Sequence, residues 1–179
     1  VGIMNKHDIG FIGAGQMAEA IARGLIETRL FPAAKIIAAD ISDDRRRVFA
    51  GMGAAVTADN AEVARSCRTI IIAVKPQNLG ELLPVLGPAF SAETLLISIC
   101  AGVPTGALEK SATSALRVVR AMPNLPVKVK QGATALCAGR NARREDMDLA
   151  RRIFSAVGRA VIVEEKLMDA VTALSGSGP

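Results

Sequence analysis

Residues 7–18 read His7-Asp8-Ile9-Gly10-Phe11-Ile12-Gly13-Ala14-Gly15-Gln16-Met17-Ala18. The short apolar run 9–12 predicts a buried strand, which ends directly in a Gly13-x-Gly15-x-x-Ala18 spacing. An amphipathic helical pattern follows without a gap. A strand, a glycine turn and a helix in this order form the fingerprint of a dinucleotide-binding fold.

Each small residue of the fingerprint has a steric reason. Gly13 permits the tight turn from strand to helix, and Gly15 lets backbone N–H groups approach a pyrophosphate. Ala18 lets the helix lie close to the strand. The start of the helix adds unpaired N–H donors and the positive end of its dipole, so we expect this turn to bind the diphosphate of a dinucleotide.

The composition is that of one globular domain. The chain has 179 residues, of which half are apolar, and no run approaches the ~20 apolar residues of a membrane span. The first residues, 1–6, lack the apolar region and cleavage site of a signal peptide. We therefore expect a soluble, cytoplasmic protein that binds no membrane.

The cysteines and charges exclude other classes of protein. Cys67, Cys100 and Cys137 are far apart and odd in number, which argues against a disulfide framework or a metal site and favours buried hydrophobic side chains. The net charge of +5 is spread along the chain, and only 3% of the residues are aromatic. Base-stacking platforms are therefore not expected, and neither is a nucleic-acid partner.

Strand and helix patterns alternate along the chain, which predicts an α/β fold. We expect a Rossmann-like, doubly wound, mostly parallel sheet with helices on both faces. Strands are expected at residues 9–12, 35–40, 55–57, 69–74, 94–99, 116–120, 133–138 and 160–163. Helices are expected at residues 78–86, 105–109, 143–157 and 166–174, with others after residues 15, 42 and 59. The sixth strand is expected to be broken by the Met-Pro-Asn-Leu-Pro sequence at 122–126.

The last residues, Ser175-Gly176-Ser177-Gly178-Pro179, combine a helix stop with a new helix start. We therefore expect residues 1–174 to form an NAD(P)-binding domain. Residues 175–179 would begin a helical domain that the chain lacks.

Ligands of open α/β sheets bind beyond the carboxyl ends of the strands. Asp40 ends the second strand, where a carboxylate would accept hydrogen bonds from ribose hydroxyls and favour NAD. The arginines at 45–47 could instead hold a 2′-phosphate, which leaves NADP possible, although a solvated helix face is the preferred interpretation. Lys75-Pro76 is expected near the nicotinamide half of the cofactor.

The residues that the chain lacks constrain its chemistry. It has no tyrosine, and its one histidine, His7, precedes the first strand and is expected to be solvated. A ketone reductase needs a positioned proton donor, whereas an imine can be protonated before hydride arrives. The sequence therefore favours reduction of a C=N bond, or a catalytic group on a segment that is not present, and identifies no catalytic residue.

Several of these segments together resemble the pyrroline-5-carboxylate reductases. The similar segments are residues 9–18, 73–76, 98–103, 120–124 and 174–179. The resemblance implies NAD(P)H-dependent reduction of 1-pyrroline-5-carboxylate to L-proline, the last step of proline biosynthesis. It implies cofactor contacts at Gly13, Ala14, Gly15, Gln16, Met17, Asp40, Asn60, Ala73, Val74, Lys75, Pro76, Ala101 and Gly102. It places Met122, Pro123 and Asn124 beside the nicotinamide and the substrate, a cyclic imino acid.

The chain departs from the family's pattern in two ways. Leu125 stands where the family usually has threonine. The family also continues beyond the Ser-Gly-Ser-Gly-Pro sequence into a helical domain that makes the dimer and holds the substrate. The resemblance thus implies a homo-oligomer for the full-length protein, and this chain alone is expected to bind dinucleotide but to turn over little substrate.

Two alternative functions remain open from the sequence. One is a β-hydroxyacid or 6-phosphogluconate dehydrogenase relative, which shares the sheet but is disfavoured by the segments at 73–76 and 122–124. The other is a non-catalytic NAD(P)-binding regulatory module.

Overall fold

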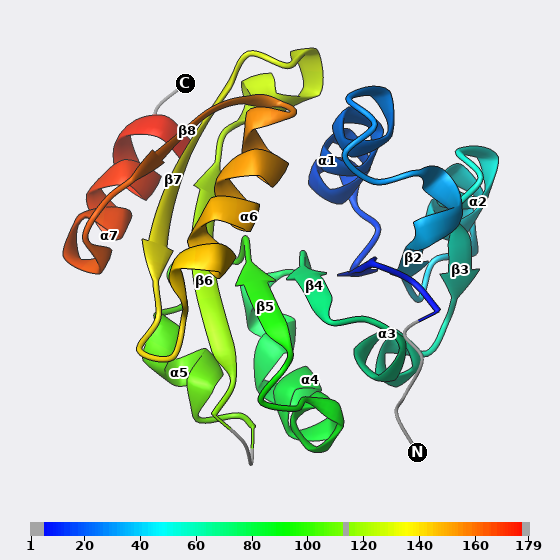
Figure 1. Cartoon of the computed structure of the whole chain (residues 1–179), viewed down its shortest axis with the longest axis horizontal. Coiled ribbons are helices and arrows are strands. Elements are labelled where there is room, and N and C mark those ends of the chain that lie inside the picture. Colours follow the sequence, from blue (N-terminus) through cyan, green and yellow to red (C-terminus); the bar gives the residue numbers. More distant parts are fainter. Residues whose placement is uncertain (1–5, 113–114, 177–179) are drawn as a thin grey trace.

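The computed structural model describes residues 6–112 and 115–176, which form one twisted sheet covered by helices (Figure 1). The described strands are β1 (Ile9–Ile12), β2 (Ile36–Ala39), β3 (Ala55–Thr57), β4 (Thr69–Ile72), β5 (Leu95–Ser98), β6 (Arg117–Pro123), β7 (Gly132–Ala138) and β8 (Gly158–Ile162). Their order is β3-β2-β1-β4-β5-β6-β7-β8. Every neighbouring pair is parallel except β6 and β7, which are antiparallel. The predicted fold class, Rossmann-like and mostly parallel, is confirmed.

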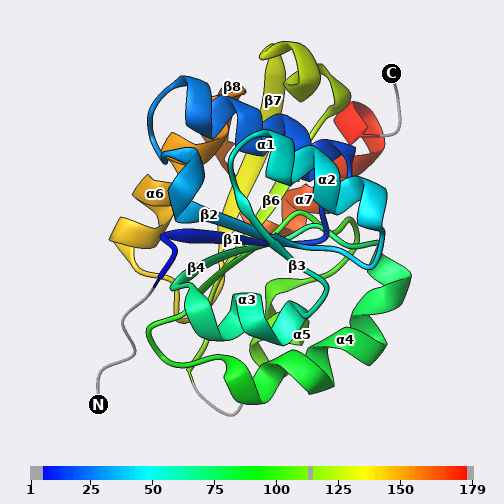
Figure 2. The same ribbon diagram turned by 90° about the vertical axis from the view of Figure 1, so that its right-hand side faces the viewer.

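Helices lie on both faces of the sheet (Figure 2). One face carries α1 (Gln16–Glu27), α2 (Asp43–Gly51) and α6 (Arg144–Ser155). The other carries α3 (Asn60–Ser66), α4 (Leu79–Leu86), α5 (Thr105–Glu109) and α7 (Met168–Val171). Short 3₁₀ helices occupy Ala33–Lys35, Pro76–Asn78, Gly87–Ala89, Leu125–Val129 and Glu165–Leu167, and a π-helical turn spans Thr172–Gly176.

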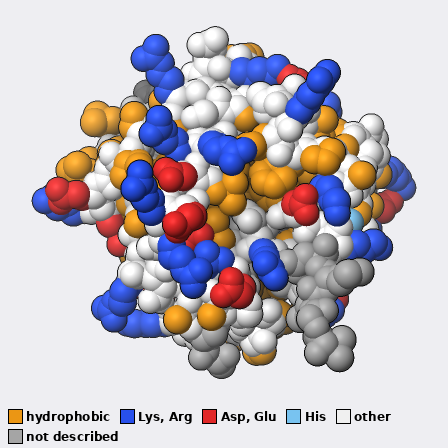
Figure 3. Space-filling model, viewed as in Figure 1, with side chains coloured by type: hydrophobic (Ala, Val, Ile, Leu, Met, Phe, Trp, Pro, Cys, Tyr) orange, Lys and Arg blue, Asp and Glu red, His pale blue; other side chains and the backbone are white. Residues whose placement is uncertain are grey.

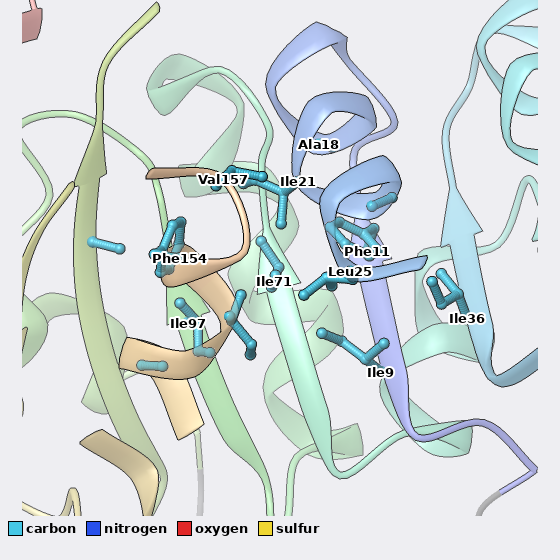
Figure 4. Close-up of a cluster of buried hydrophobic side chains, with 14 of the residues drawn as sticks. Ile9, Phe11, Ala18, Ile21, Leu25, Ile36, Ile71, Ile97, Phe154 and Val157 are labelled. Atoms are coloured by element: carbon cyan, nitrogen blue, oxygen red, sulfur yellow. The ribbon is translucent and has the colours of Figure 1, made fainter. Parts of the chain in front are cut away.

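The larger buried cluster joins the sheet to α1 and α6 (Figure 4). The cluster includes Phe11 of β1, Ile71 of β4, Leu25 of α1 and Phe154 of α6, and all four are fully buried. Each such side chain contributes roughly 1.5–3 kcal/mol of burial free energy. The predicted apolar stripe of α6, which includes Phe154, is buried in this cluster as expected.

Gly10 of β1 explains why α3 can lie close against the sheet. A Cβ atom at this position would overlap the side chains of Val63 and Cys67 on the far side of the strand. Gly10 is therefore a packing residue, and the buried Cys67 fills space as a hydrophobic side chain.

The prediction that proline breaks the sixth strand is wrong, because β6 continues through Pro123. The N–H of Arg117 donates to Thr94 beside β5, and alternation along the strand turns the nitrogen of Pro123 to the same side. On that side β5 has already ended, since its last pair joins Ser98 to Arg120. Pro123 therefore costs no ladder hydrogen bond and still pairs with Thr134 of β7.

Two further sequence expectations need correction or lie outside the described residues. His7 is 5% exposed, not solvated, and burial together with the nearby charge of Lys6 lowers its pKa. The segment 166–174, predicted as one helix, is a succession of 3₁₀, α and π turns. The expectations for residues 1–5 and 177–179 fall outside the described residues. Over the described ranges, no helix has the length and apolarity needed to span a membrane.

Candidate functional site

The carboxyl ends of the parallel strands meet at one edge of the sheet, and the chain changes direction there. From β1 it moves outward to β2 and β3, and then returns to β4 on the other side of β1. The loops after β1 and β4 therefore flank the switch point, where ligands of such sheets bind.

Gly13 makes the turn at this switch point. Its φ angle is +93°, and a Cβ atom would lie 2.7 Å from the carbonyl oxygen of Ala73 in the loop after β4. Only glycine avoids both the strained φ and this collision. The tight turn expected from the sequence is thus present and packs directly against the β4 loop.

Gly15 faces open space and begins α1. A Cβ atom there would meet nothing within 4 Å, and Gly15 is the N-cap residue of the helix. The N–H groups of Gly15, Gln16 and Met17 form no hydrogen bond with any group in the described part of the chain. Residues 15–17 thus form a cradle with open space and free donors at a helix start, which suits a diphosphate.

Asp40 follows β2 and is bound to the glycine turn. One carboxylate oxygen accepts the N–H of Ala14 at 2.8 Å, and the other accepts the N–H of Ser42 at 2.8 Å. The residue therefore stands beside the turn, as predicted, and its carboxylate also orients the backbone there.

The expectation of a solvated arginine face holds only for Arg47, whose side chain is 72% exposed. Arg45 donates to the carbonyl of Ala14 at 2.6 Å and pairs with Glu19 at 2.8 Å. Arg46 donates to the carbonyl of Asp40 at 2.6 Å. Two of the three arginines thus hold backbone at the candidate site.

Glu19 on α1 is the acidic partner of this arrangement. The hydrogen bond from Arg45 is the main reason that its pKa is lowered, with a smaller contribution from Arg23. The carboxylate therefore stays charged at neutral pH. Arg23, Arg45 and Lys128 surround Glu19 and Gln16 in a hollow of about 380 Å³. Other basic side chains are scattered over the surface seen in Figure 3.

The loops after β3, β4 and β5 hold the remaining predicted cofactor contacts. Asn60 is the first residue of α3, beyond β3, on the Asp40 side of the edge. Lys75 and Pro76 are exposed at the start of a 3₁₀ turn. Gly102 is also exposed and has a φ angle of +73°. These positions agree with the predicted edge of the sheet, while the contacts themselves remain predictions.

A pocket of about 260 Å³ lies where the loops after β1, β4, β5 and β6 meet. Its lining residues are Met17, Ala73, Val74, Ile99, Met122, Pro123, Asn124 and Leu125. The structure thus brings together six residues that the sequence assigned to the cofactor or the substrate. Sequence reasoning missed Ile99, whose only signal is its place just after β5. No titratable side chain is among these lining residues.

Asn124 forms a corner of this pocket and is held from two sides. Its side-chain oxygen accepts the N–H of Ala133 at the start of β7, at 2.9 Å. Its side-chain nitrogen donates to the hydroxyl of Ser175 at 3.1 Å. The contact with Ser175 joins residues 51 positions apart, and no local pattern indicates it.

Arg120 of β6 fastens the last described segment to the sheet. Its side chain is 4% exposed and pairs with Asp169 at 2.8 Å. Glu165 lies 3.9 Å from the same guanidinium and also accepts hydrogen bonds from the N–H and hydroxyl of Thr105. Residues 165–169 are therefore tied to both β6 and the start of α5.

The three cysteines are free and buried, as expected. Burial raises the pKa of the Cys67 and Cys137 thiols to about 11 and also raises that of Cys100. Cys100 donates a weak hydrogen bond to the carbonyl of Val74 at 3.3 Å, which links the loops after β4 and β5. The thiols are thus protonated packing groups at neutral pH.

Comparison with known proteins gives concordant relatives. The family described as "NADP oxidoreductase coenzyme F420-dependent" matches residues 8–102. A pyrroline-5-carboxylate reductase of Methanosarcina acetivorans is 44% identical over 177 residues, which cover 98% of this chain and 66% of that protein.

Two solved structures are also similar. The reductase of Coxiella burnetii is 36% identical with a TM-score of 0.89, covering 98% of this chain and 66% of that one. The Plasmodium falciparum enzyme, solved with NADP bound, is 32% identical with a TM-score of 0.85, covering 98% and 64%.

The chain spans just under two thirds of the length of these relatives. The glycine motif at the start of α1, the strand order of the sheet and the length of the alignments all indicate the same family. The chain therefore belongs to the family described as NADP oxidoreductase, coenzyme F420-dependent, and over 98% of its length it is a relative of the pyrroline-5-carboxylate reductases.

Proposed function

We propose that this protein binds NADPH or NADH and takes part in the reduction of 1-pyrroline-5-carboxylate to L-proline. The support is the set of reductases to which the chain is similar, one of them solved with NADP. A hydroxyacid dehydrogenase is less well supported, because the three reductases named above are 32–44% identical to this chain, whereas a prephenate dehydrogenase of the same fold is 17% identical.

One observation carries the proposal: the diphosphate cradle and the apolar pocket share Met17. This residue has an N–H at the start of α1 that no described residue accepts, and it lines the pocket with Asn124. A ligand held at the cradle would thus extend directly into the pocket. The arrangement would join a binding site for an anionic cofactor to a pocket for a small substrate, lined by apolar side chains and Asn124.

We assign the roles of the residues from this arrangement. Gly13, Ala14, Gly15, Gln16 and Met17 would hold the diphosphate, and Asp40 with Asn60 would face the adenosine. Residues 73–76 together with Ala101 and Gly102 would hold the nicotinamide half. Met122, Pro123 and Asn124 would contact the substrate.

Bound NAD(P)H supplies the hydride for this reaction. The chain's own contribution is to exclude water with apolar side chains and to orient the substrate with the fixed amide of Asn124. The pocket lining contains no titratable group. This absence fits an imine that is protonated before reduction better than a ketone, which would require an acid at the pocket.

Titration with NADPH and with NADH, followed by nicotinamide fluorescence, tests the binding step. We expect both to bind, with the imine reduced slowly by this chain and no turnover of β-hydroxyacids. Preferential oxidation of a hydroxyacid would contradict the proposed substrate, and failure to bind either dinucleotide would contradict the proposed function.

The partners and setting belong to the same proposal. We propose a small cyclic imino acid as substrate, a homo-oligomer for the complete protein, and a cytoplasmic location. The free, buried cysteines suit a reducing compartment.

A further inference from the structure

Arg45 reaches from α2 across to the glycine turn after β1. Its Nε donates to the carbonyl oxygen of Ala14 at 2.6 Å, and its terminal nitrogen pairs with Glu19 at 2.8 Å. The side chain is 27% exposed, compared with 72% for Arg47 two residues later. The contact crosses 31 positions of sequence and joins the adenosine side of the candidate site to the diphosphate turn.

The carbonyl that Arg45 binds belongs to the peptide unit that carries the Gly15 N–H. This unit is planar and trans, so its C=O and N–H point in opposite directions. A guanidinium that fixes the carbonyl of Ala14 therefore also fixes the direction of the Gly15 N–H. That N–H has no partner among the described residues, and a Cβ atom on the same residue would meet nothing within 4 Å.

The preceding peptide unit is fixed in the same way from the other side. The Ala14 N–H donates to the Asp40 carboxylate at 2.8 Å. The N–H of Ala14 is thus bound by the carboxylate of Asp40, and its C=O is bound by the guanidinium of Arg45. Both side chains come from the segment after β2. The two contacts oppose rotation of the turn, which would carry the donors away from an anion.

The charge of Arg45 is paired with a carboxylate of the same chain. Glu19 balances it and is itself held ionised, because the hydrogen bond from Arg45 lowers the pKa of Glu19. A guanidinium paired in this way is a poor choice for a second anion such as a 2′-phosphate, but it still cancels the partial negative charge of the Ala14 carbonyl beside the cradle.

We infer that Arg45 is a positioning residue that aims the Gly15 N–H at the cofactor diphosphate, and that it does not bind the 2′-phosphate of NADP. The inference rests on the proposed dinucleotide function. It requires NADH and NADPH to depend on Arg45 equally, since both carry the diphosphate. A direct 2′-phosphate ligand would matter for NADPH alone.

The test measures dissociation constants of NADPH, NADH and adenosine 2′-monophosphate by calorimetric titration. In Arg45→Met we expect both dinucleotides to weaken by the same factor, about tenfold, with adenosine 2′-monophosphate unchanged. Arg45→Lys should lose less, because an ammonium can still donate to the Ala14 carbonyl. Arg47→Met is the matched control and should bind all three ligands normally.

Amide NMR of the ligand-free protein adds a readout that a general loss of stability would not move. The Gly15 amide signal should shift or broaden in Arg45→Met while signals of β4 and β5 stay in place, and Arg45→Lys should reverse part of the change. If Arg45→Met does not fold, Arg45→Lys alone decides through the same ratio of NADH to NADPH affinity.

The outcomes separate the inference from the function beneath it. Weakening of NADPH and adenosine 2′-monophosphate with NADH spared would overturn the positioning role and leave dinucleotide binding intact. Failure of the unaltered protein to bind either dinucleotide would overturn the proposed function itself.

Discussion

On the side of β1, β2 and β4 the candidate site offers main-chain N–H groups that Asp40 and Arg45 hold in place, whereas on the side of β6 and β7 it is formed by side chains. Gly13 and Gly15 expose N–H groups and leave space. Asn124 and Arg120 act through an amide and a guanidinium fixed by distant partners. The first side depends on the space that its two glycines leave, and the second depends on side chains that distant partners hold in place. Substitutions should therefore damage the two sides in different ways.

The largest expected effect separates two glycines within the main-chain side. Gly13→Ala forces a side chain into a positive φ and against Ala73, so we expect a stability loss of about 2–4 kcal/mol. Gly15→Ala has room and should leave stability within about 0.5 kcal/mol of the original. Its methyl group fills the cradle, so NADPH affinity should fall at least tenfold.

Urea denaturation and NADPH titration of both variants check this prediction. Gly51→Ala is the matched control, because its position is also open but lies at the end of α2. It should leave NADPH affinity unchanged. Normal NADPH binding by a folded Gly15→Ala protein would show that the cradle lies elsewhere.

A smaller effect is expected when a contact on the side of β6 and β7 is removed. Arg120→Met removes the contacts with Asp169 and Glu165, so α7 should leave the sheet more often. Cys137 of β7 packs against Met168 of α7, and its alkylation rate should rise about twofold to fivefold, in line with the strength of a partly exposed ion pair. Alkylation of Cys67, under α3, should stay unchanged.

Mass spectrometry of iodoacetamide-treated protein measures both cysteines in one sample. Lys166→Met serves as the control, since Lys166 is exposed and pairs only with Glu164 among the described residues. An equal rise in the alkylation rates of Cys67 and Cys137 would mean that Arg120 acts on global stability. The distinction between the two sides of the site would then fail.

The smallest expected effect concerns the pH dependence of stability that His7, just before β1, contributes. Burial lowers the pKa of His7 below its ordinary value of 6.5, so the unfolded chain binds the proton more readily. The stability contribution of neutral His7 is therefore complete above pH 6.5 and is lost as the pH falls toward the folded pKa. The loss should be under about 1 kcal/mol.

His7→Gln should remove this part of the pH dependence, as measured by urea denaturation at pH 7.5 and pH 5.5. His7 precedes β1, at the opposite end of the strand from the cradle. Dinucleotide affinity at pH 7.5 should therefore be the same in His7→Gln and the unaltered protein. A greater loss of stability between the two pH values in the variant would reverse the sign argued here.

The sequence predicts the main-chain side well because glycine positions and strand ends are local signals. Gly13 and Gly15 carry their steric reasons in their spacing, and the short strand Ala55–Thr57 was predicted at its observed bounds. The family resemblance then adds Met122 to Asn124, which the structure places in the pocket.

The sequence predicts the contacts of charged side chains poorly because their partners are distant in the chain. Arg45 looks like part of a solvated run, but its partner Ala14 lies 31 positions away. Arg120 meets Asp169 across 49 positions. The prediction that Pro123 breaks the strand fails because the tolerance of β6 for proline depends on where β5 ends, which is a property of the neighbouring strand.

β6 is longer than β5 at the edge of the sheet where the pocket lies, and its residues Met122 and Pro123 line the pocket. Beyond its last pair with β5, β6 continues for three more residues, Ala121 to Pro123, which pair with β7 alone among the described strands. Each residue added to β6 would lengthen this part of the strand by about 3.3 Å and turn the side chains beyond it to the opposite face of the sheet. Two added residues would lengthen the strand and leave Met122 on its present face. Inserting or deleting pairs of residues in both β6 and β7 should therefore change, in steps of two residues, the size of the molecule that this pocket admits.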